Sequence, residues 1–71
     1  MQKIYTVTGY YQYGINQAID FHHYQVQAYS LKQARFLVEK EIMWKAFGKE
    51  ITSPKQIPFT VRKQVQHFII K

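Results

Sequence analysis

The sequence predicts a small α+β domain, in which a small antiparallel sheet is covered on one face by one main helix. Three observations support this fold class. Residues 3–28 are rich in β-branched and aromatic types that alternate between two faces, residues 30–48 carry the signals of a capped amphipathic helix, and residues 59–70 return to β-branched types. The expected order is therefore β-β-α-β, and a chain of 71 residues has room for a single domain, residues 1–71.

The first two strands are expected to form a hairpin. Residues 3–13 and 18–28 are the two strands, and Gly14-Ile15-Asn16 supplies residues between them that tolerate positive φ. Alternation along the second strand shifts near His22 and His23, which either a β-bulge or a slip of register explains. The first strand is expected to place two sets of side chains on opposite faces, namely Tyr5, Val7, Tyr11 and Tyr13 on one and Ile4, Thr6, Thr8 and Tyr10 on the other.

The main helix has a clear start and a clear end. Ser30 can cap the amide of Gln33, and the Gln33 side chain can return the bond. Gly48 is expected to end the helix as a left-handed residue. One side of the helix carries an apolar stripe that should pack on the sheet, made of Leu31, Ala34, Val38 and Ile42, with Leu37 and Trp44 along one edge.

The last part of the chain fits more than one structure. Pro54 and Pro58 restrict the residues before them to extended backbone, so residues 49–58 are expected to form a connector with room for one helical turn at Ser53. Residues 59–70 alternate as a strand does, but they also place Val61, Val65, Phe68 and Ile69 at helical spacing. Their β-branched types favour the strand, and the helical alternative gives the order β-β-α-α.

Charge is unevenly distributed along the chain. The net charge is +6. The only charged residues among residues 1–30 are Lys3 and Asp20, which cancel, so all the excess positive charge comes after Leu31. Clustered positive charge favours an anionic partner such as nucleic acid. Cysteine is absent, no apolar run is long enough to span a bilayer, and the first residues lack the apolar region of a signal peptide. We therefore expect a cytoplasmic protein that does not bind membranes.

The sequence offers little for catalysis. It has one Asp, three Glu, three His and no Cys, so we expect no enzyme activity and no cofactor. His22 and His23 look like a metal pair, but neighbours on a regular strand point to opposite faces. We expect ordinary sheet histidines and no metal site, unless a bulge turns the two side chains together.

Two surfaces are candidates for binding. A short helix covers only one face of a sheet, so some of the six tyrosines should be exposed, where they can stack on bases beside a basic third strand carrying Arg62 and Lys63. The alternative is that these tyrosines simply suit half-buried strands. The second surface is a helix stripe roughly opposite the sheet-facing side, made of Phe36, Met43 and Phe47. Either residues 51–58 cover this stripe, or it binds a protein partner or a second copy of the chain.

Parts of the pattern resemble the archaeal LX family of large-ribosomal-subunit proteins, which are small, basic β-β-α-β domains that bind RNA. The resemblance rests on Ile4-Tyr5-Thr6-Val7-Thr8-Gly9 in the first strand, Val26-Gln27-Ala28 at the end of the second, and the capped helix over residues 31–42. It covers about two thirds of the chain and implies the fold and RNA binding. The chain departs from the family in its few arginines, its many tyrosines and glutamines, and its proline-marked connector.

These observations favour a nucleic-acid-binding accessory protein, with RNA preferred over DNA. Stacking is assigned to Tyr10, Tyr11 and Tyr13, and phosphate contacts to Lys49, Lys55, Arg62, Lys63 and Lys71. The alternative is a protein-binding module, such as a phage or mobile-element inhibitor of a host nucleic-acid-processing machine. That module would use the stripe of Phe36, Met43 and Phe47.

Overall fold

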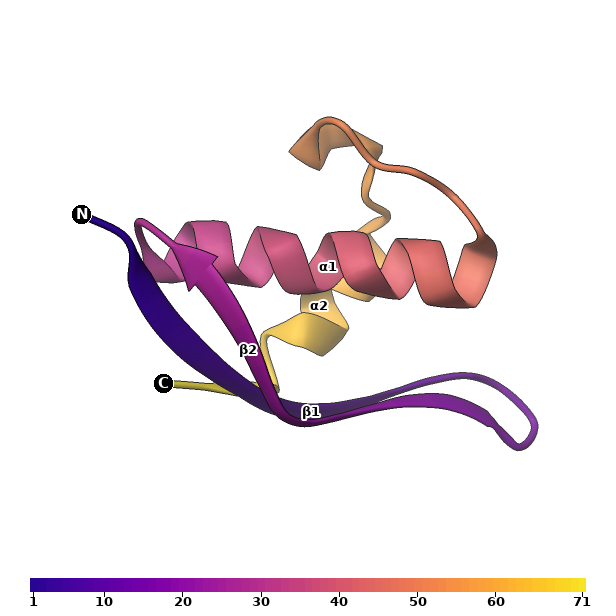
Figure 1. The fold of residues 1–71 in the computed structure, drawn as a ribbon. Coiled ribbons are helices and arrows are strands. Elements are labelled where there is room, and N and C mark those ends of the chain that lie inside the picture. Colours follow the sequence, from indigo (N-terminus) through magenta and orange to yellow (C-terminus); the bar gives the residue numbers. More distant parts are fainter.

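A three-stranded antiparallel sheet carries two helices on one of its faces. The computed structural model describes all residues from 1 to 71. The sheet order is β2-β1-β3, and α1 lies across the sheet with α2 beside it (Figure 1). The elements in chain order are β1 (Lys3–Gly14), β2 (Gln17–Ala28), α1 (Leu31–Phe47), the 3-10 turn η1 (Pro54–Gln56), α2 (Phe59–Val65) and β3 (Ile69–Ile70). The predicted fold class is confirmed: the fold is α+β, with the main helix packed on an antiparallel sheet.

The predicted hairpin is also confirmed. β1 and β2 pair from Lys3 with Ala28 to Gly14 with Gln17. The chain reverses at Ile15 and Asn16, and Asn16 has a φ of 59°. Asparagine tolerates this left-handed conformation better than most residues, which explains why it follows Ile15 at the turn.

A β-bulge interrupts β2 at the histidine pair. Two residues of β2, His22 and His23, lie opposite the single residue Thr8 of β1, and His23 has a φ of 55°. The bulge, rather than a slip of register, therefore explains the shifted alternation. Because the bulge adds one residue, Phe21 and Tyr24 both face the helices, and their ring centroids lie 5.3 Å apart.

The ends of α1 follow the predicted capping scheme with one difference. The Ser30 hydroxyl accepts a hydrogen bond from the Gln33 amide at 3.1 Å, whereas the Gln33 side chain accepts from the amide of Tyr29, one residue before the cap. Gly48 has a φ of 65° and donates its amide to the carbonyl of Trp44. Both ends of the helix are therefore determined by residues next to them in the sequence.

The sheet-facing stripe of α1 is narrower than predicted. Ala34, Val38 and Ile42 are completely buried, as expected. Leu31, which was expected within this stripe, and Trp44, which was expected along its edge, are 40% and 59% exposed. The expectation that these two side chains are buried against the sheet is therefore wrong.

The strand predicted over residues 59–70 is wrong for most of its length, because Phe59–Val65 is the helix α2 and only Ile69–Ile70 is a strand. Val61 and Val65 are completely buried on one side of this helix. In a strand, Lys63 would point to the same face as both valines and so into the core. In the helix Lys63 is exposed, which explains why the helical period prevails here. The order β-β-α-α-β thus combines the two alternatives.

The end of the chain is attached to the centre of the sheet. Lys71 and Thr6 exchange two backbone hydrogen bonds, of 2.8 and 3.0 Å. The Phe68 ring packs over Gly9 and lies 5.5 Å from the ring of Phe21. A Cβ at position 9 would lie within 3.0 Å of three Phe68 ring atoms, so this contact requires glycine.

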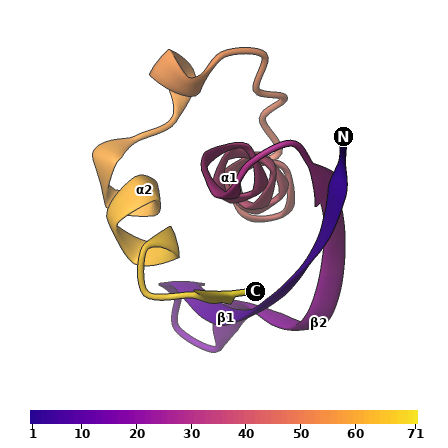
Figure 2. The ribbon, with the colours of Figure 1, turned by 90° about the vertical axis from the view of Figure 1, so that its left-hand side faces the viewer.

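The two faces of the sheet differ in character. The helices lie on the concave side of the curved strands (Figure 2), and the buried apolar residues form one cluster there. The other face carries polar side chains such as those of Gln25 and Gln27, together with Tyr10. The core therefore lies between the hairpin and the two helices.

Candidate functional site

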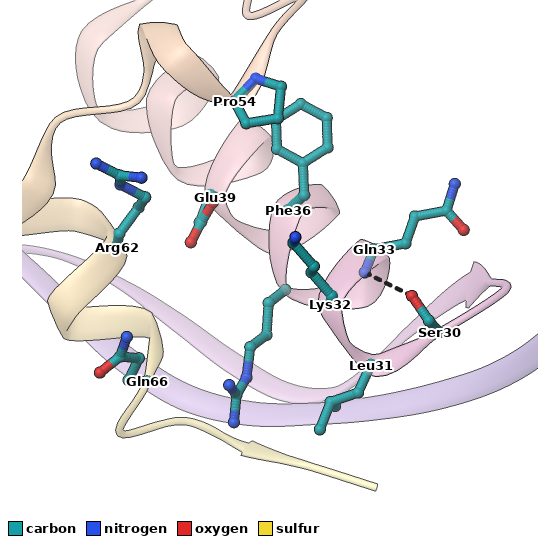
Figure 3. Close-up of a pocket in the computed structure, with 10 residues that line it drawn as sticks. Ser30, Leu31, Lys32, Gln33, Phe36, Glu39, Pro54, Arg62 and Gln66 are labelled. Carbon is teal, nitrogen blue, oxygen red and sulfur yellow. Dashed lines mark hydrogen bonds between the residues drawn. The ribbon is translucent and has the colours of Figure 1, made fainter.

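A groove of about 610 Å³ runs between the first half of α1, the turn η1 and α2 (Figure 3). Its walls combine charged and apolar side chains. Lys32, Arg35 and Glu39 come from α1, where spacings of three and four residues place them along one side of the helix. Arg62 comes from α2 and rises beside Glu39 in Figure 3.

The groove thus contains three cations and one carboxylate, and no close ion pair joins them. The only ion pair in the structure joins Lys45 to Glu41 at 3.5 Å, and it lies in the second half of α1. Arg35 and Arg62 nevertheless act on the Glu39 carboxyl through their charge. The groove therefore keeps an excess of positive charge that no protein carboxylate neutralises by contact.

Arg35 has an unsatisfied donor. Its Nε is buried and has no hydrogen-bond partner. Leaving a buried donor unpaired costs about 1–3 kcal/mol. An acceptor that entered the groove and reached Nε would remove this cost, which makes Arg35 a candidate ligand-binding residue.

Glu39 is the one charged residue of the core region, with 8% of its surface exposed. Burial raises the pKa of its carboxyl, and the charges of Arg62 and Arg35 oppose that rise without cancelling it. The ionised carboxylate can accept hydrogen bonds from a ligand, and the protonated form can donate one.

The upper wall of the groove is apolar. Phe36 is half-buried and lines the groove together with Pro54 of η1 (Figure 3). The ammonium of Lys40 lies 5.7 Å from the centre of the Phe36 ring. A flat apolar group therefore has a surface to pack on next to the cationic wall.

The predicted phosphate-binding residues are distributed over three places. Arg62 lines the groove. Lys55 on η1 and Lys63 on α2 are exposed, and both belong to elements that contribute residues to the groove. Arg62 and Lys63 lie on a helix and not on a basic third strand, so that expectation is wrong. Lys49 lines a separate hollow of about 310 Å³, and Lys71 follows β3 and pairs with Thr6 of β1.

The three predicted stacking tyrosines do not form one exposed surface. Tyr11 is only 9% exposed and stacks on Tyr13 at 6.3 Å between ring centroids. Phe47 of α1 packs against both rings, at 6.5 and 6.4 Å. The expectation that Tyr11 is available to a base is therefore wrong, whereas Tyr10 is 52% exposed on the open face of the sheet.

The helix stripe predicted for partner binding is also divided. Met43 is buried in the core, together with Ile51 and Ile57 from the connector, so residues 51–58 supply the covering that the sequence allowed. Phe36 is a wall of the groove and Phe47 packs on the tyrosines. The three side chains therefore present no continuous exposed stripe.

Sequence reasoning missed most of the groove. Lys32, Arg35, Glu39 and Gln66 were not among the predicted site residues. The available signal was the spacing of Arg35 and Glu39, four residues apart on the same side of a helix. That spacing is also typical of a solvated helix surface, and only the position of α2 makes it part of a groove.

The bulge does bring the two histidines together. The ring centroids of His22 and His23 lie 4.3 Å apart. No group of three or more His, Cys, Asp or Glu side chains is placed to hold a metal ion. None of the helices has the length and apolar character needed to cross a membrane.

Comparisons with known proteins give no match. A scan against protein-family models finds none that fits the chain, and searches of curated proteins and of solved structures find no significant similarity. The resemblance to the archaeal LX family therefore stays a prediction.

Proposed function

We propose that this chain is a small, non-enzymatic, basic protein that binds nucleic acid as an accessory factor, with RNA preferred over DNA. The observation that carries the proposal is the convergence of Lys32, Arg35 and Arg62 on one groove that contains a single carboxylate. Phosphate is the anion that such a cluster suits best, since arginine offers two parallel donors to two phosphate oxygens.

The surroundings of the groove support the same function. Lys55 and Lys63 are exposed on the two elements that form one side of it. A strand of nucleic acid that follows this side would meet the positive charge of these two lysines in addition to that of the groove. The preference for RNA comes from the resemblance to the LX family and from the groove carboxylate, which suits a ribose hydroxyl as a donor.

Salt dependence of binding tests the proposal. We expect a fluorescent single-stranded RNA of mixed sequence to bind with an affinity that falls as salt rises, with a slope of about −0.7 per phosphate contact. Arg62→Gln should weaken binding and reduce the slope by about 0.7, because it removes one contact. An unlabelled DNA of the same sequence should compete less well than the RNA.

Lys45→Gln is the matched control. It removes one positive charge, as Arg62→Gln does, but Lys45 is paired with Glu41 in the last turns of α1. Equal effects of the two variants would show that only net charge matters. Absence of salt-dependent binding to both RNA and DNA would contradict the proposal.

The second candidate is the protein-binding module, for example an inhibitor of a host nucleic-acid-processing machine. It is favoured by Trp44 and Phe47, which are 59% and 47% exposed on the second half of α1. Large exposed aromatics are typical anchors of protein interfaces. Capture of a host protein that survives nuclease treatment, is lost in Trp44→Ser and is kept in Arg62→Gln would favour this candidate over nucleic-acid binding.

A further inference from the structure

The groove between α1 and α2 is larger than a single anion requires. Its volume of about 610 Å³ lies within the range of about 300–1,000 Å³ that holds small organic ligands. Its two walls differ, because Phe36 and Pro54 are apolar whereas Arg35 and Arg62 are cationic. The groove therefore suits a ligand with one flat apolar part and one anionic part.

The cationic wall is unusual for this chain. Of its ten basic residues only two are arginines, Arg35 and Arg62, and both line this groove. They come from different helices, and the charge of each acts on the Glu39 carboxyl. A phosphate between them would contact both helices and offer an acceptor to the unpaired Nε of Arg35.

Glu39 would repel a phosphate that approached it directly. Its place beside Arg62 (Figure 3) instead suits a ligand that carries a hydrogen-bond donor close to its phosphate. Ribose hydroxyls and the amino groups of bases are such donors, and carboxylates accept from them. The three features together describe a nucleotide.

We propose that this groove binds one nucleotide, with the phosphate between Arg35 and Arg62, the base against Phe36 and Pro54, and a hydroxyl or amino donor of the nucleotide on Glu39. This inference rests on the proposed function and names the unit that the site recognises. The nucleotide is either free or part of an RNA strand, since both present the same groups.

Nuclear magnetic resonance titrations of the isotope-labelled full chain test this inference. The four nucleoside 5′-monophosphates, inorganic phosphate, and a short single-stranded RNA are added separately. A nucleotide is expected to shift the amide signals of α1 and α2 around the groove and the Nε–H signal of Arg35, in a saturable way. The RNA should bind at least about tenfold more tightly than a monophosphate if a strand is the ligand, and equal affinities would identify the free nucleotide.

Three variants separate the parts of the site. Phe36→Ala should weaken nucleotide binding about tenfold, through lost stacking, but leave inorganic phosphate unchanged. Arg35→Lys keeps the charge and loses the planar fork, so it should weaken both ligands about tenfold. Lys45→Gln should change neither. The amide spectrum of each variant shows whether it is folded, and Pro54→Ser replaces Phe36→Ala if the latter unfolds.

The outcomes distinguish this inference from the proposed function. If RNA binds with the expected salt dependence but no nucleotide shifts the groove signals at about 10 mM, the nucleotide site is overturned and nucleic-acid binding stands. If inorganic phosphate binds as tightly as the monophosphates, the apolar wall contributes nothing and the inference is also overturned. If neither RNA nor nucleotides bind, both fail.

Discussion

Replacing Gly9 with alanine should damage the contact that holds the end of the chain on the sheet. The new methyl group would lie within 3.0 Å of three atoms of the Phe68 ring, which packs on the strand at this position. Phe68 is 6% exposed and also contacts Phe21 in the core. The ring therefore has to move, and it cannot move without leaving part of the core.

The size of the effect follows from three contributions. Overpacking costs about 1–3 kcal/mol. Displacing a buried phenylalanine loses part or all of the free energy of burying its side chain, which is about 1.5–3 kcal/mol. Alanine recovers about 0.5–1 kcal/mol relative to glycine within a strand. We expect Gly9→Ala to lower the free energy of unfolding by about 2–5 kcal/mol, a large part of the stability of a domain this small.

Equilibrium unfolding in urea, followed by circular dichroism, measures this loss. Gly14→Ala is the control, since its methyl group would meet mainly the flexible end of the Gln17 side chain, and we expect a change below about 0.5 kcal/mol. Combining Gly9→Ala with Phe68→Leu should give a loss smaller than the sum of the single losses by about 1 kcal/mol or more. Wild-type stability in Gly9→Ala, or strict additivity in the double variant, would refute the reasoning.

Three further predictions concern the same fold. Burial raises the pKa of Glu39, so its neutral form favours the folded state, and the stability that it contributes is lost as pH rises through the folded pKa. Glu39→Gln should therefore remove this loss, so that the variant unfolds at a higher temperature than the wild type at pH 7 but not at pH 4. The gain in the free energy of unfolding at pH 7 should be about 1.4 kcal/mol for each unit by which the folded pKa of Glu39 exceeds the unfolded one. Parallel pH profiles of the two proteins would contradict this. His23→Val should cost about 1–2 kcal/mol in chemical denaturation because His23 has a φ of 55°, whereas His22→Val should be nearly neutral, and equal losses would argue against the bulge. Ser30→Ala should cost about 1 kcal/mol in the same assay through loss of the helix cap, and no change would mean that the bond to Gln33 contributes nothing.

Local signals explain why much of the fold was predictable. The cap at Ser30, the stop at Gly48 and the turn before Gln17 depend on residues within a few positions of each other. The alternation that shifts at His22 and His23 was visible too, but the sequence left both a bulge and a slip of register open, and the strand pairing decides for the bulge. The cap, the stop and the turn are each decided by backbone preferences that a short sequence already contains.

The second helix was less predictable because its local signals conflict. Val61 and Val65 satisfy both the strand period and the helical period, and their β-branched shape favours a strand. The structure buries both of them and leaves Lys63 exposed, which only the helix permits. Tertiary packing thus overrides local propensity in this segment.

The groove depends on the same packing step, because α2 brings Arg62 to the side of α1 that carries Arg35 and Glu39. These three residues could serve only to hold the helices together, with the arginines compensating a buried acid. One observation argues against that role: neither arginine forms an ion pair within 4.0 Å of the carboxylate. The charges of both arginines lower the pKa of Glu39, but burial raises it by more, so the arginines do not fully compensate the buried acid. No carboxylate of the protein pairs with either arginine, and the proposed nucleotide site would use the donors that are left.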